Sequence, residues 1–298
     1  MPDDGDDQPG VTAHKSYFAR EIQVVYIELS NDCNLRCLYC SRNKFSNDRP
    51  IQHMKLEMLE SIVKMYPKNV MFGLYSGGEP LTYPQFPEAV KIANHKGNRT
   101  RIHTNGTLLT RELSAKIVEA GLTDIVFSID GIDPEDYERI RGVKFEKVHE
   151  NITDFMEINQ GKVKVGVNCL VGAGKELKLN SGLADIEEFF DFKIIDRPHS
   201  WLYGKEIPEW VDQGVIRIPC LFLHSYMVIA VDGDYLLCCH CLNKEKILGN
   251  IKDRTAQEIY DNEMEAIRQK QIAGDFIRPC SNCDRYRDKS KKERECVG

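Results

Sequence analysis

The sequence predicts an α/β protein in which parallel strands alternate with helices and a small hairpin-and-helix unit follows. Apolar runs rich in β-branched residues alternate along the chain with stretches whose apolar residues recur at helical spacing. Units of this kind build a parallel sheet with right-handed crossovers, whose functional loops gather at the carboxyl ends of the strands. Later in the chain, two apolar runs join at Asp232-Gly233, which is typical of an antiparallel hairpin.

The individual elements follow from these periodicities. We expect strands at residues 22–29, 70–75, 101–104, 124–129, 162–170 and 192–195, and amphipathic helices at residues 54–65, 86–95, 111–120 and 148–158. In the carboxyl-terminal third, Thr255-Ala-Gln-Glu258 has the pattern of a capping box and predicts the start of another helix. That helix should end before Gly274.

Composition narrows the class of protein. A chain of 298 residues with 42% apolar residues can hold one large α/β domain and a small appendage. Its formal net charge of −6 gives no indication of nucleic-acid binding. The acidic residues 1–10 lack the apolar core of a secretory signal, and no apolar run is long enough to span a membrane. Eleven cysteines without an export signal favour metal ligation over disulfides, so we expect a cytoplasmic protein.

The first group of candidate ligands is Cys33, Cys37 and Cys40, directly after the first predicted strand. Four cysteines saturate a cubane iron–sulfur cluster or a structural zinc, whereas three leave one metal position open for a substrate or cofactor. The spacing alone does not choose iron over zinc, so a zinc knuckle or a set of reduced thiols remains an alternative.

With Tyr39 before the last cysteine, this spacing resembles that of the radical S-adenosylmethionine (radical SAM) enzymes. The segment Tyr75-Ser-Gly-Gly-Glu-Pro80 is similar to the glycine-glycine-glutamate segment of the same family. Gly77 and Gly78 allow close backbone approach to a ligand, and Glu79 can accept hydrogen bonds from an ammonium group. The resemblance implies a partial (βα)6 barrel whose three cysteines hold a [4Fe-4S] cluster that binds S-adenosylmethionine (SAM) at its open iron.

Other polar residues follow the later strands. Each lies in an ordinary turn or strand on its own, and the resemblance implies that they contact the cofactor. These cofactor candidates are Asn105, Ser128, Asp130, Arg141 and Asn168. His103 lies between Ile102 and Thr104 in a predicted buried strand, which indicates a core histidine rather than a catalytic base.

A second cysteine group lies in the carboxyl-terminal third. The hairpin should return the chain and bring Cys238 toward Cys220. The arrangement resembles the twitch, a shortened SPASM domain, and this resemblance implies one auxiliary [4Fe-4S] cluster. Its implied ligands are Cys220, Cys238, Cys280 and Cys283, with zinc as the alternative metal because four cysteines suit both. Cys296 lies too far along the chain to complete a second auxiliary cluster.

Cys239 and Cys241 are then left over beside the proposed auxiliary site. A thiol near a substrate can donate a hydrogen atom, so both are candidate hydrogen donors. The alternatives are a buried apolar neighbour or, for Cys239, a ligand in place of Cys238. Cys169 lies among valines in a predicted strand and should belong to the core.

These assignments divide the chain into four parts. We expect a disordered tail at residues 1–18, the barrel at residues 19–200, the twitch-like domain at residues 215–285 and a basic tail at residues 286–298.

The resemblance implies that reductive cleavage of SAM yields a radical that takes a hydrogen atom from the substrate. Dehydrogenation with the auxiliary cluster as electron acceptor is the leading interpretation. An epimerase, a peptide- or protein-modifying maturase and a zinc-stabilised binding protein are the alternatives. Since mostly polar residues precede the first strand, where many peptide-modifying relatives carry a recognition domain, we expect a small hydroxyl-rich substrate such as a sugar or aminocyclitol. The family implies an electron donor such as flavodoxin or ferredoxin as partner.

Overall fold

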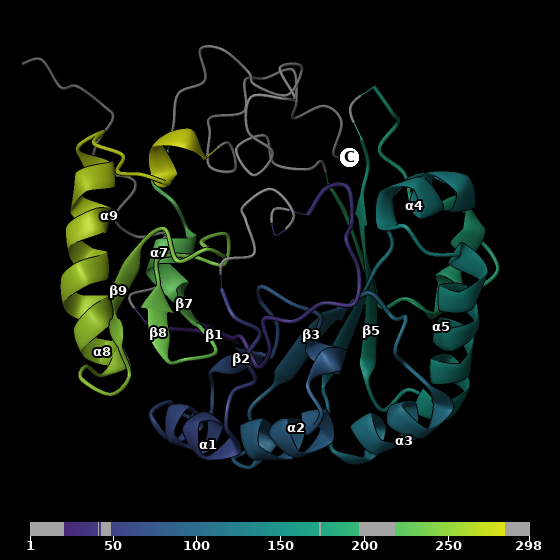
Figure 1. Cartoon of the computed structure of the whole chain (residues 1–298), viewed down its shortest axis with the longest axis horizontal. Coiled ribbons are helices and arrows are strands. Elements are labelled where there is room, and N and C mark those ends of the chain that lie inside the picture. The colour runs from purple at the N-terminus through teal and green to yellow at the C-terminus, as the bar shows by residue number, and fades with distance from the viewer. Residues whose placement is uncertain (1–20, 41, 43–48, 173, 197–217, 284–298) are drawn as a thin grey trace, which may run out of the picture.

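A nine-stranded sheet organises the part of the chain that the structure describes. This structure is a computed structural model, and it describes residues 21–40, 42, 49–172, 174–196 and 218–283. The strand order is β6-β5-β4-β3-β2-β1-β7-β8-β9, and β1 to β6 run parallel (Figure 1). These six are β1 (Val24–Ile27), β2 (Met71–Gly73), β3 (Thr100–Thr104), β4 (Asp124–Ser128), β5 (Lys164–Leu170) and β6 (Phe192–Asp196). The six predicted parallel strands are confirmed.

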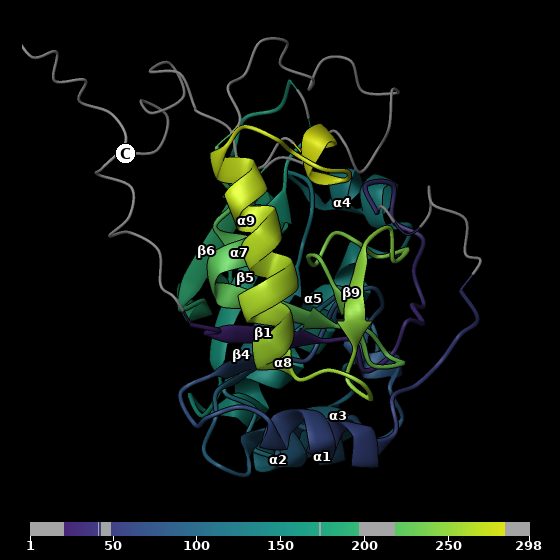
Figure 2. The same cartoon turned by 90° about the vertical axis from the view of Figure 1, so that its left-hand side faces the viewer.

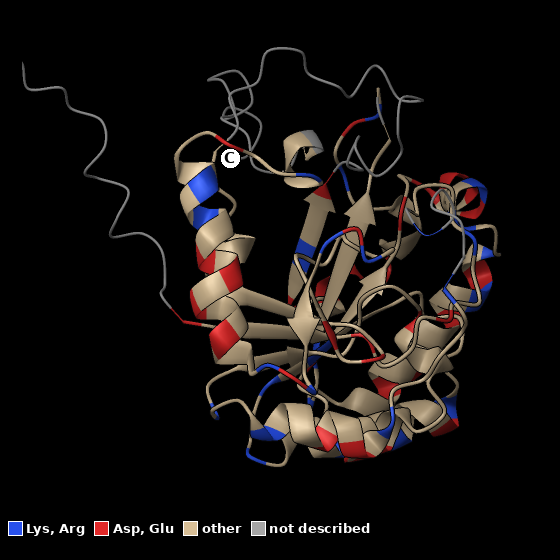
Figure 3. Cartoon of the chain, turned by 60° about the vertical axis from the view of Figure 1, so that its left-hand side comes forward, with Lys and Arg blue, Asp and Glu red and all other residues tan. Residues whose placement is uncertain are grey.

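Helices cover the outer face of this curved sheet (Figure 1). Four of them lie where the periodicity predicts: α1 (Leu56–Lys64), α2 (Phe86–Asn94), α3 (Arg111–Glu119) and α5 (Phe145–Asn159). Short 3₁₀ turns add η3 (Pro80–Thr82), η4 (Ser181–Leu183) and η5 (Glu187–Phe189). Lys and Arg mix with Asp and Glu along the helices that face the viewer in Figure 3.

One barrel helix, α4 (Pro134–Arg141), was not among the predicted helices. Asp133 caps its amino end by accepting a hydrogen bond from the Asp136 N–H at 2.8 Å, and Pro134 occupies the first turn. Gly142, with φ of 74°, ends it in the left-handed conformation that favours glycine. The helix is short and mostly polar, so its capping residues indicate a helix in the sequence more clearly than its apolar pattern does.

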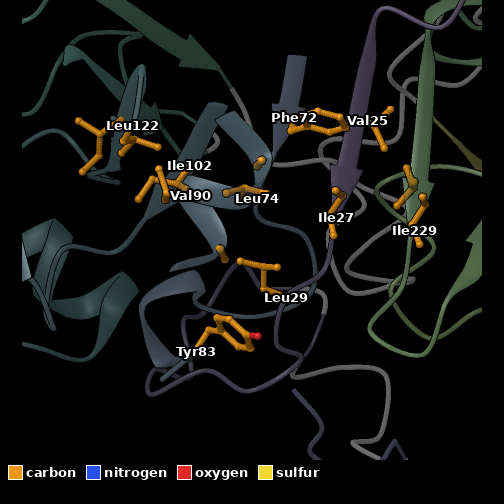
Figure 4. Packing of buried hydrophobic residues seen from close by; sticks show 14 of the residues in the cluster. Val25, Ile27, Leu29, Phe72, Leu74, Tyr83, Val90, Ile102, Leu122 and Ile229 are labelled. Carbon is orange, nitrogen blue, oxygen red and sulfur yellow. The ribbon is translucent and has the colours of Figure 1, made fainter. Parts of the chain in front are cut away.

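The core lies between the sheet and the helices. Val25, Ile27 and Phe72 are fully buried, and Figure 4 shows them pointing from adjacent strands into one apolar cluster. Each such side chain contributes about 1.5–3 kcal/mol by leaving water. Because strand side chains alternate, Tyr26 between Val25 and Ile27 faces the opposite, inner side of the sheet. The inner face therefore carries a different set of residues from the core.

The carboxyl-terminal third extends the same sheet. After the short helix α7 (Phe222–Ser225), β7 (Tyr226–Ile229) pairs parallel with β1, and β8 (Asp234–Leu236) and β9 (Ile247–Asn250) follow antiparallel. One helical segment then runs across this end of the molecule, as α8 (Ala256–Glu258), the π-turn η8 (Ile259–Met264) and α9 (Glu265–Ile272) (Figure 2). Thr255 and Glu258 form the predicted capping box, and the helix ends before Gly274 as expected. The turn η9 (Cys280–Asn282) follows.

The predicted hairpin is present, but its turn differs from the expected one. Gly233 alone in the turn has a positive φ, of 91°, and its N–H donates to the Ala230 carbonyl at 2.9 Å. The Ala230 N–H in turn donates to the Asp234 carbonyl at 2.9 Å. This is a three-residue loop that ends in a left-handed glycine, rather than a two-residue turn with two positive φ angles.

No helix of the described residues is long and apolar enough to cross a membrane. The predicted tails at residues 1–18 and 286–298, and Cys296 with them, lie outside the described residues. The predicted domain boundaries stay predictions.

Candidate functional site

The first cysteine group lies in a loop that begins directly after β1. The Leu38 N–H donates to the Ile140 carbonyl at 2.7 Å, which fastens the loop to the end of α4. The pKa of Cys33 is raised to about 11, mainly by burial, and Glu79, Cys40 and Cys37 contribute to the rise. Burial also raises the pKa of Cys37, while Arg141 opposes this shift. These mutual effects place the three sulfurs near one another, and their role as cluster ligands stays a prediction.

The glycine-glycine-glutamate segment packs against this loop. The Glu79 N–H donates to the Asp32 carbonyl at 2.8 Å. A Cβ on Gly78 would lie 2.2 Å from the Asp32 carbonyl oxygen, and a Cβ on Gly77 would lie 2.4 Å from Glu28 Oε1. The two glycines are therefore required for close approach between segments of this chain. Their predicted contact with the cofactor stays a prediction.

Glu79 is buried and already holds three donors. Its Oε1 accepts hydrogen bonds from Thr104 Oγ1 at 2.7 Å and from the Leu81 N–H at 3.1 Å, and its Oε2 accepts one from the Asn105 N–H at 2.8 Å. Burial raises the pKa of Glu79, although these hydrogen bonds favour its charged form. A carboxylate has about four acceptor sites, so one remains on Oε2 for the predicted ammonium group.

Most hydrogen-bonding groups of the Asn105 side chain already have partners within the protein. Its oxygen accepts hydrogen bonds from the Thr107 N–H at 2.9 Å and the Thr107 hydroxyl at 2.6 Å, and its amide nitrogen donates to Asn34 Oδ1 at 3.0 Å. Asn34 belongs to the cysteine loop. Asn105 therefore ties the end of β3 to that loop, and its predicted contact with SAM is not needed to explain its position.

Asp130 and Arg141 form a buried ion pair beside the cysteine loop. Arg141 Nη2 lies 2.7 Å from Asp130 Oδ2, and Arg141 Nη1 lies 3.7 Å from Cys37 Sγ. Burial opposes the charge of Arg141, but Asp130 and Cys37 raise its pKa above the usual range. Arg141 Nε is buried and has no hydrogen-bond partner among the described residues. An unsatisfied buried donor of this kind fits an anionic group, such as the carboxylate of SAM, beside the cluster.

Ser128 and Asn168 lie opposite each other on β4 and β5. Both side chains are half-buried, and neither has a hydrogen-bond partner in the described part of the chain. They face the inner side of the sheet at the carboxyl ends of the strands, where a ligand can use both groups. Their predicted roles as cofactor contacts are therefore compatible with the geometry.

The second cysteine group also comes together. Burial raises the pKa of Cys220, and Cys238, Cys280 and Cys283 raise it further. Burial raises the pKa of Cys280 to about 12, with further contributions from Cys238 and Cys283. Gln271 on α9 accepts a hydrogen bond from the Cys220 N–H at 2.8 Å and so places the first cysteine against the helix. The hairpin, the helix and the terminal cysteine pair thus lie near one another, and the role of these cysteines as auxiliary ligands stays a prediction.

Four cysteines suit either a cubane cluster or a single zinc ion, and the two metals differ in the sulfur spacing that they require. Zinc–sulfur bonds of about 2.3 Å require tetrahedral sulfurs within roughly 4 Å of one another. Among the described residues, no three His, Cys, Asp or Glu side chains are arranged to hold one metal ion. A cubane cluster places a separate iron behind each cysteine, so its ligands lie farther apart.

Cys239 and Cys241 lie in different surroundings. Cys241 is fully buried, and its sulfur lies 3.8 Å from Cys238 Sγ. This contact lowers the pKa of Cys238 and raises that of Cys241. Cys239 is half-buried. Burial is the main cause of the raised pKa values of Tyr26 and Tyr75, and Cys239 contributes to both. Cys239 therefore lies near the inner face of the sheet, where both tyrosines point.

Sequence reasoning missed this aromatic group on the inner face. Tyr75 stacks on His103 with ring centroids 4.3 Å apart and meets Tyr26 edge to face at 5.2 Å. Tyr26 also stacks on Tyr226 at 5.7 Å. Burial lowers the pKa of His103 to about 3, which favours the neutral imidazole, but the ring faces the inner side of the sheet and not the core where it was predicted. The alternation of Tyr26 with Val25 and Ile27 was the indication in the sequence.

Residues 27–177, half of the chain, match the Radical SAM superfamily. The chain belongs to the radical SAM superfamily. Residues 220–284 match SPASM, described as an iron-sulfur cluster-binding domain. The predicted family, fold and cofactors are thereby confirmed: radical SAM domains carry a [4Fe-4S] cluster and SAM, and SPASM domains carry auxiliary iron–sulfur clusters. The two cysteine groups described above fit these cofactors in number and position.

Curated relatives of the chain include several GTP 3',8-cyclases. The enzyme of Chlorobaculum tepidum is 34% identical over 165 residues, which cover 53% of this chain and 48% of that protein. The probable GTP 3',8-cyclase of Methanococcus aeolicus is 32% identical over 252 residues, which cover 76% of this chain and 83% of that protein. The match spans only about half of the length of the C. tepidum enzyme and of the probable GTP 3',8-cyclase of Methanococcus maripaludis (strain C7).

Solved structures share the fold at low identity. BtrN in complex with AdoMet and 2-DOIA has a TM-score of 0.60 and 17% identity, and the match covers 88% of this chain and 93% of BtrN. Streptococcus suis SuiB bound to the precursor peptide SuiA has a TM-score of 0.59 and 17% identity, with 84% of this chain and 67% of SuiB covered. At these identities the similarity establishes the fold alone.

Proposed function

We propose that this radical SAM enzyme dehydrogenates a small hydroxylated substrate, such as a sugar or aminocyclitol, and that its auxiliary cluster accepts an electron. One observation carries the proposal. Cys238 is one of the predicted auxiliary ligands, and the next residue, Cys239, lies near Tyr26 and Tyr75 on the inner face of the sheet. The auxiliary site is therefore one residue away from the surface where a substrate would lie.

The residues of the chain have separate tasks in this reaction. Cys33, Cys37 and Cys40 would hold the first cluster, while Arg141, Ser128 and Asn168 offer groups to SAM. When bound, the first cluster and SAM supply the radical that removes a hydrogen atom, and the auxiliary cluster supplies an electron acceptor. A secondary alcohol that loses a hydrogen atom from carbon, then an electron and the hydroxyl proton, leaves as a ketone.

The polarity of the inner face supports a substrate without phosphate groups over a nucleoside triphosphate. Near the cysteine loops this face offers phenol, neutral imidazole, hydroxyl and amide groups. The guanidinium of Arg101 is already bonded to Asp124 at 3.2 Å, and that of Arg141 to Asp130 at 2.7 Å. These two cations of the described residues are thus already paired, whereas a triphosphate such as that of GTP requires several available cations, so we do not transfer the cyclase activity of the relatives to this chain.

The substrate is identified by mass spectrometry. The anaerobically reconstituted enzyme is incubated with SAM, dithionite and a panel of sugars, aminocyclitols and GTP. The proposal predicts a product lighter than one hydroxylated substrate by two hydrogen atoms, formed together with 5′-deoxyadenosine. Replacing Cys280 and Cys283 with Ala should abolish the ketone while 5′-deoxyadenosine still forms. Conversion of GTP alone would reject the proposal.

Epimerisation is the second candidate, because Cys239 lies close to the inner face. A thiol in this place can return a hydrogen atom to a substrate radical from the side of the auxiliary domain, which inverts the carbon. Cys241 is fully buried against Cys238, so it is the less accessible of the two predicted donors. A Cys241→Ala variant therefore serves as the matched control for Cys239→Ala.

A further inference from the structure

Glu28 is a buried carboxylate between β1 and the first cysteine loop, and no role has been given to it so far. Only 1% of its surface is exposed. Arg49 binds it with both terminal nitrogens: Nη1 donates to Oε1 at 3.1 Å and Nη2 donates to Oε2 at 2.6 Å. Two parallel bonds of this kind fix the orientation of both planar groups. A buried carboxylate at this place depends on such a partner.

The same pair reaches two points of the auxiliary domain. Glu28 Oε2 accepts a hydrogen bond from the Val231 N–H, in the hairpin turn, at 3.0 Å. Arg49 Nη1 donates to the Leu242 carbonyl at 2.8 Å. Residues 231–242 contain Cys238, Cys239 and Cys241 between these two points. One ion pair therefore holds both ends of the segment that carries the auxiliary cysteines.

The pair also touches the site on the other side. A Cβ on Gly77 would lie 2.4 Å from Glu28 Oε1 and 3.6 Å from Leu242 Cδ2. Glu28 thus lies between the glycine-glycine-glutamate segment and the auxiliary domain. Backbone pairing with β1 fixes β7, as in the bond from the Glu28 N–H to the Ile229 carbonyl at 2.9 Å. Leu242 lies beyond the last paired residue of β8, so no strand pairing holds it. The hydrogen bond from Arg49 to its carbonyl holds this part of the segment instead.

We propose that Glu28 and Arg49 are positioning residues that fix residues 231–242 against the first cysteine loop and so set the separation of the two cluster sites. The inference rests on the two cluster domains and not on the identity of the substrate. It predicts that loss of either side chain loosens this segment and leaves the rest of the barrel unchanged.

Hydrogen exchange of the full-length, reconstituted enzyme tests the local part of the proposal. In Glu28→Gln and Arg49→Met, peptides that cover residues 231–242 should exchange at least about tenfold faster, since the Val231 N–H and its neighbours lose a fixed acceptor. Peptides from α3 and β4 should exchange as in the wild type. Arg49→Lys keeps the positive charge but has only one terminal nitrogen in place of two, so it should give an exchange rate between those of the wild type and Arg49→Met.

Arg99→Met is the matched control. Arg99 also donates to both oxygens of a buried carboxylate, that of Asp124, at 2.9 and 3.0 Å, but it makes no contact with residues 231–242. Pulsed EPR of the reduced enzyme should show one narrow distribution of cluster-to-cluster distances in the wild type and in Arg99→Met, and a broader one in Arg49→Met.

Two results would overturn the inference. One is unchanged exchange at residues 231–242 together with an unchanged distance distribution in both Glu28→Gln and Arg49→Met. The other is an equal increase in the hydrogen-exchange rate across the whole chain, which would show that the variants destabilise the whole protein and do not loosen residues 231–242 alone. If Arg49→Met does not retain its clusters, Arg49→Lys and Glu28→Gln provide the same comparison with a smaller structural change.

Discussion

Arg141 Nη2 lies 2.7 Å from Asp130 Oδ2 in a buried ion pair. The other terminal nitrogen of the same guanidinium contacts Cys37 Sγ at 3.7 Å, so Asp130 acts on the first cluster site through Arg141. Both residues were predicted as cofactor contacts. The structure shows that Asp130 also holds the arginine in place, and its contact with the cofactor stays a prediction.

Replacing Asp130 with Asn tests this relationship. The change leaves Arg141 buried without its counter-charge, and breaking a buried ion pair costs about 3–5 kcal/mol. We expect a loss of free energy of unfolding of that size in anaerobic chemical denaturation, with weaker binding of SAM in calorimetry. Asp154→Asn is the control, because the Arg111–Asp154 pair is partly exposed and such pairs contribute about 1 kcal/mol or less. Equal losses in both variants would contradict the assigned role of Asp130.

The iron content tests the two cysteine groups. Two cubane clusters correspond to about eight iron atoms in the reconstituted protein. Replacing Cys33, Cys37 and Cys40 together with Ala should halve this content, and so should replacing Cys280 and Cys283. Cys169→Ala should keep all the iron, because Cys169 is buried in β5 and its sulfur donates to the Gly131 carbonyl at 3.0 Å. Full iron content in the triple variant would show that the first site is wrongly assigned.

Glu79→Gln should affect both SAM binding and stability. The carboxylate accepts three hydrogen bonds within the protein, so an amide in its place directs an N–H group at one of the donors. Charge-assisted hydrogen bonds contribute about 1.5–3 kcal/mol, so SAM affinity should fall roughly tenfold or more in calorimetry. Thr104→Val removes one of these bonds but keeps the charge. It should lower the melting temperature with little change in SAM affinity.

Much of the fold was predictable because its main signals are local. Buried strands and amphipathic helices have distinct apolar periods, and the cysteine spacings identify both cluster loops. The caps of α4 were also visible in Asp133, Pro134 and Gly142, but its apolar pattern is weak. The hairpin turn was placed correctly, although its type depends on backbone angles that two residue names do not determine.

The partners of the site residues were less predictable, because they come from distant parts of the chain. Arg49 and Leu242 are 193 positions apart in the sequence, and Thr104 and Glu79 are 25 apart. Burial decides which of several polar side chains is used inside the protein and which remains available to a ligand. For this reason Asn105 and Ser128 could not be distinguished by their sequence context, although the structure gives them different surroundings.

Acid should destabilise the protein through His103. Burial lowers the pKa of this histidine from 6.5 to about 3, so below pH 6.5 the unfolded chain takes up a proton that the folded protein does not. Stability therefore falls as the pH falls, by about 2 kcal/mol between pH 6.5 and pH 5. His103→Phe keeps the ring beside Tyr75 and should lose less stability over this range in anaerobic denaturation. The exposed His95→Gln should behave as the wild type.

The most direct test of the proposed reaction is the mass of the product formed in deuterium oxide. If the enzyme is a dehydrogenase, the product is lighter than the substrate by two hydrogen atoms, carries no deuterium at the reacting carbon and still forms in the Cys239→Ala variant. If the thiol of Cys239 returns a hydrogen atom, the product is an isomer of the substrate with one deuterium at the inverted carbon. Such a product, lost in Cys239→Ala and retained in Cys241→Ala, would contradict dehydrogenation and establish an epimerase.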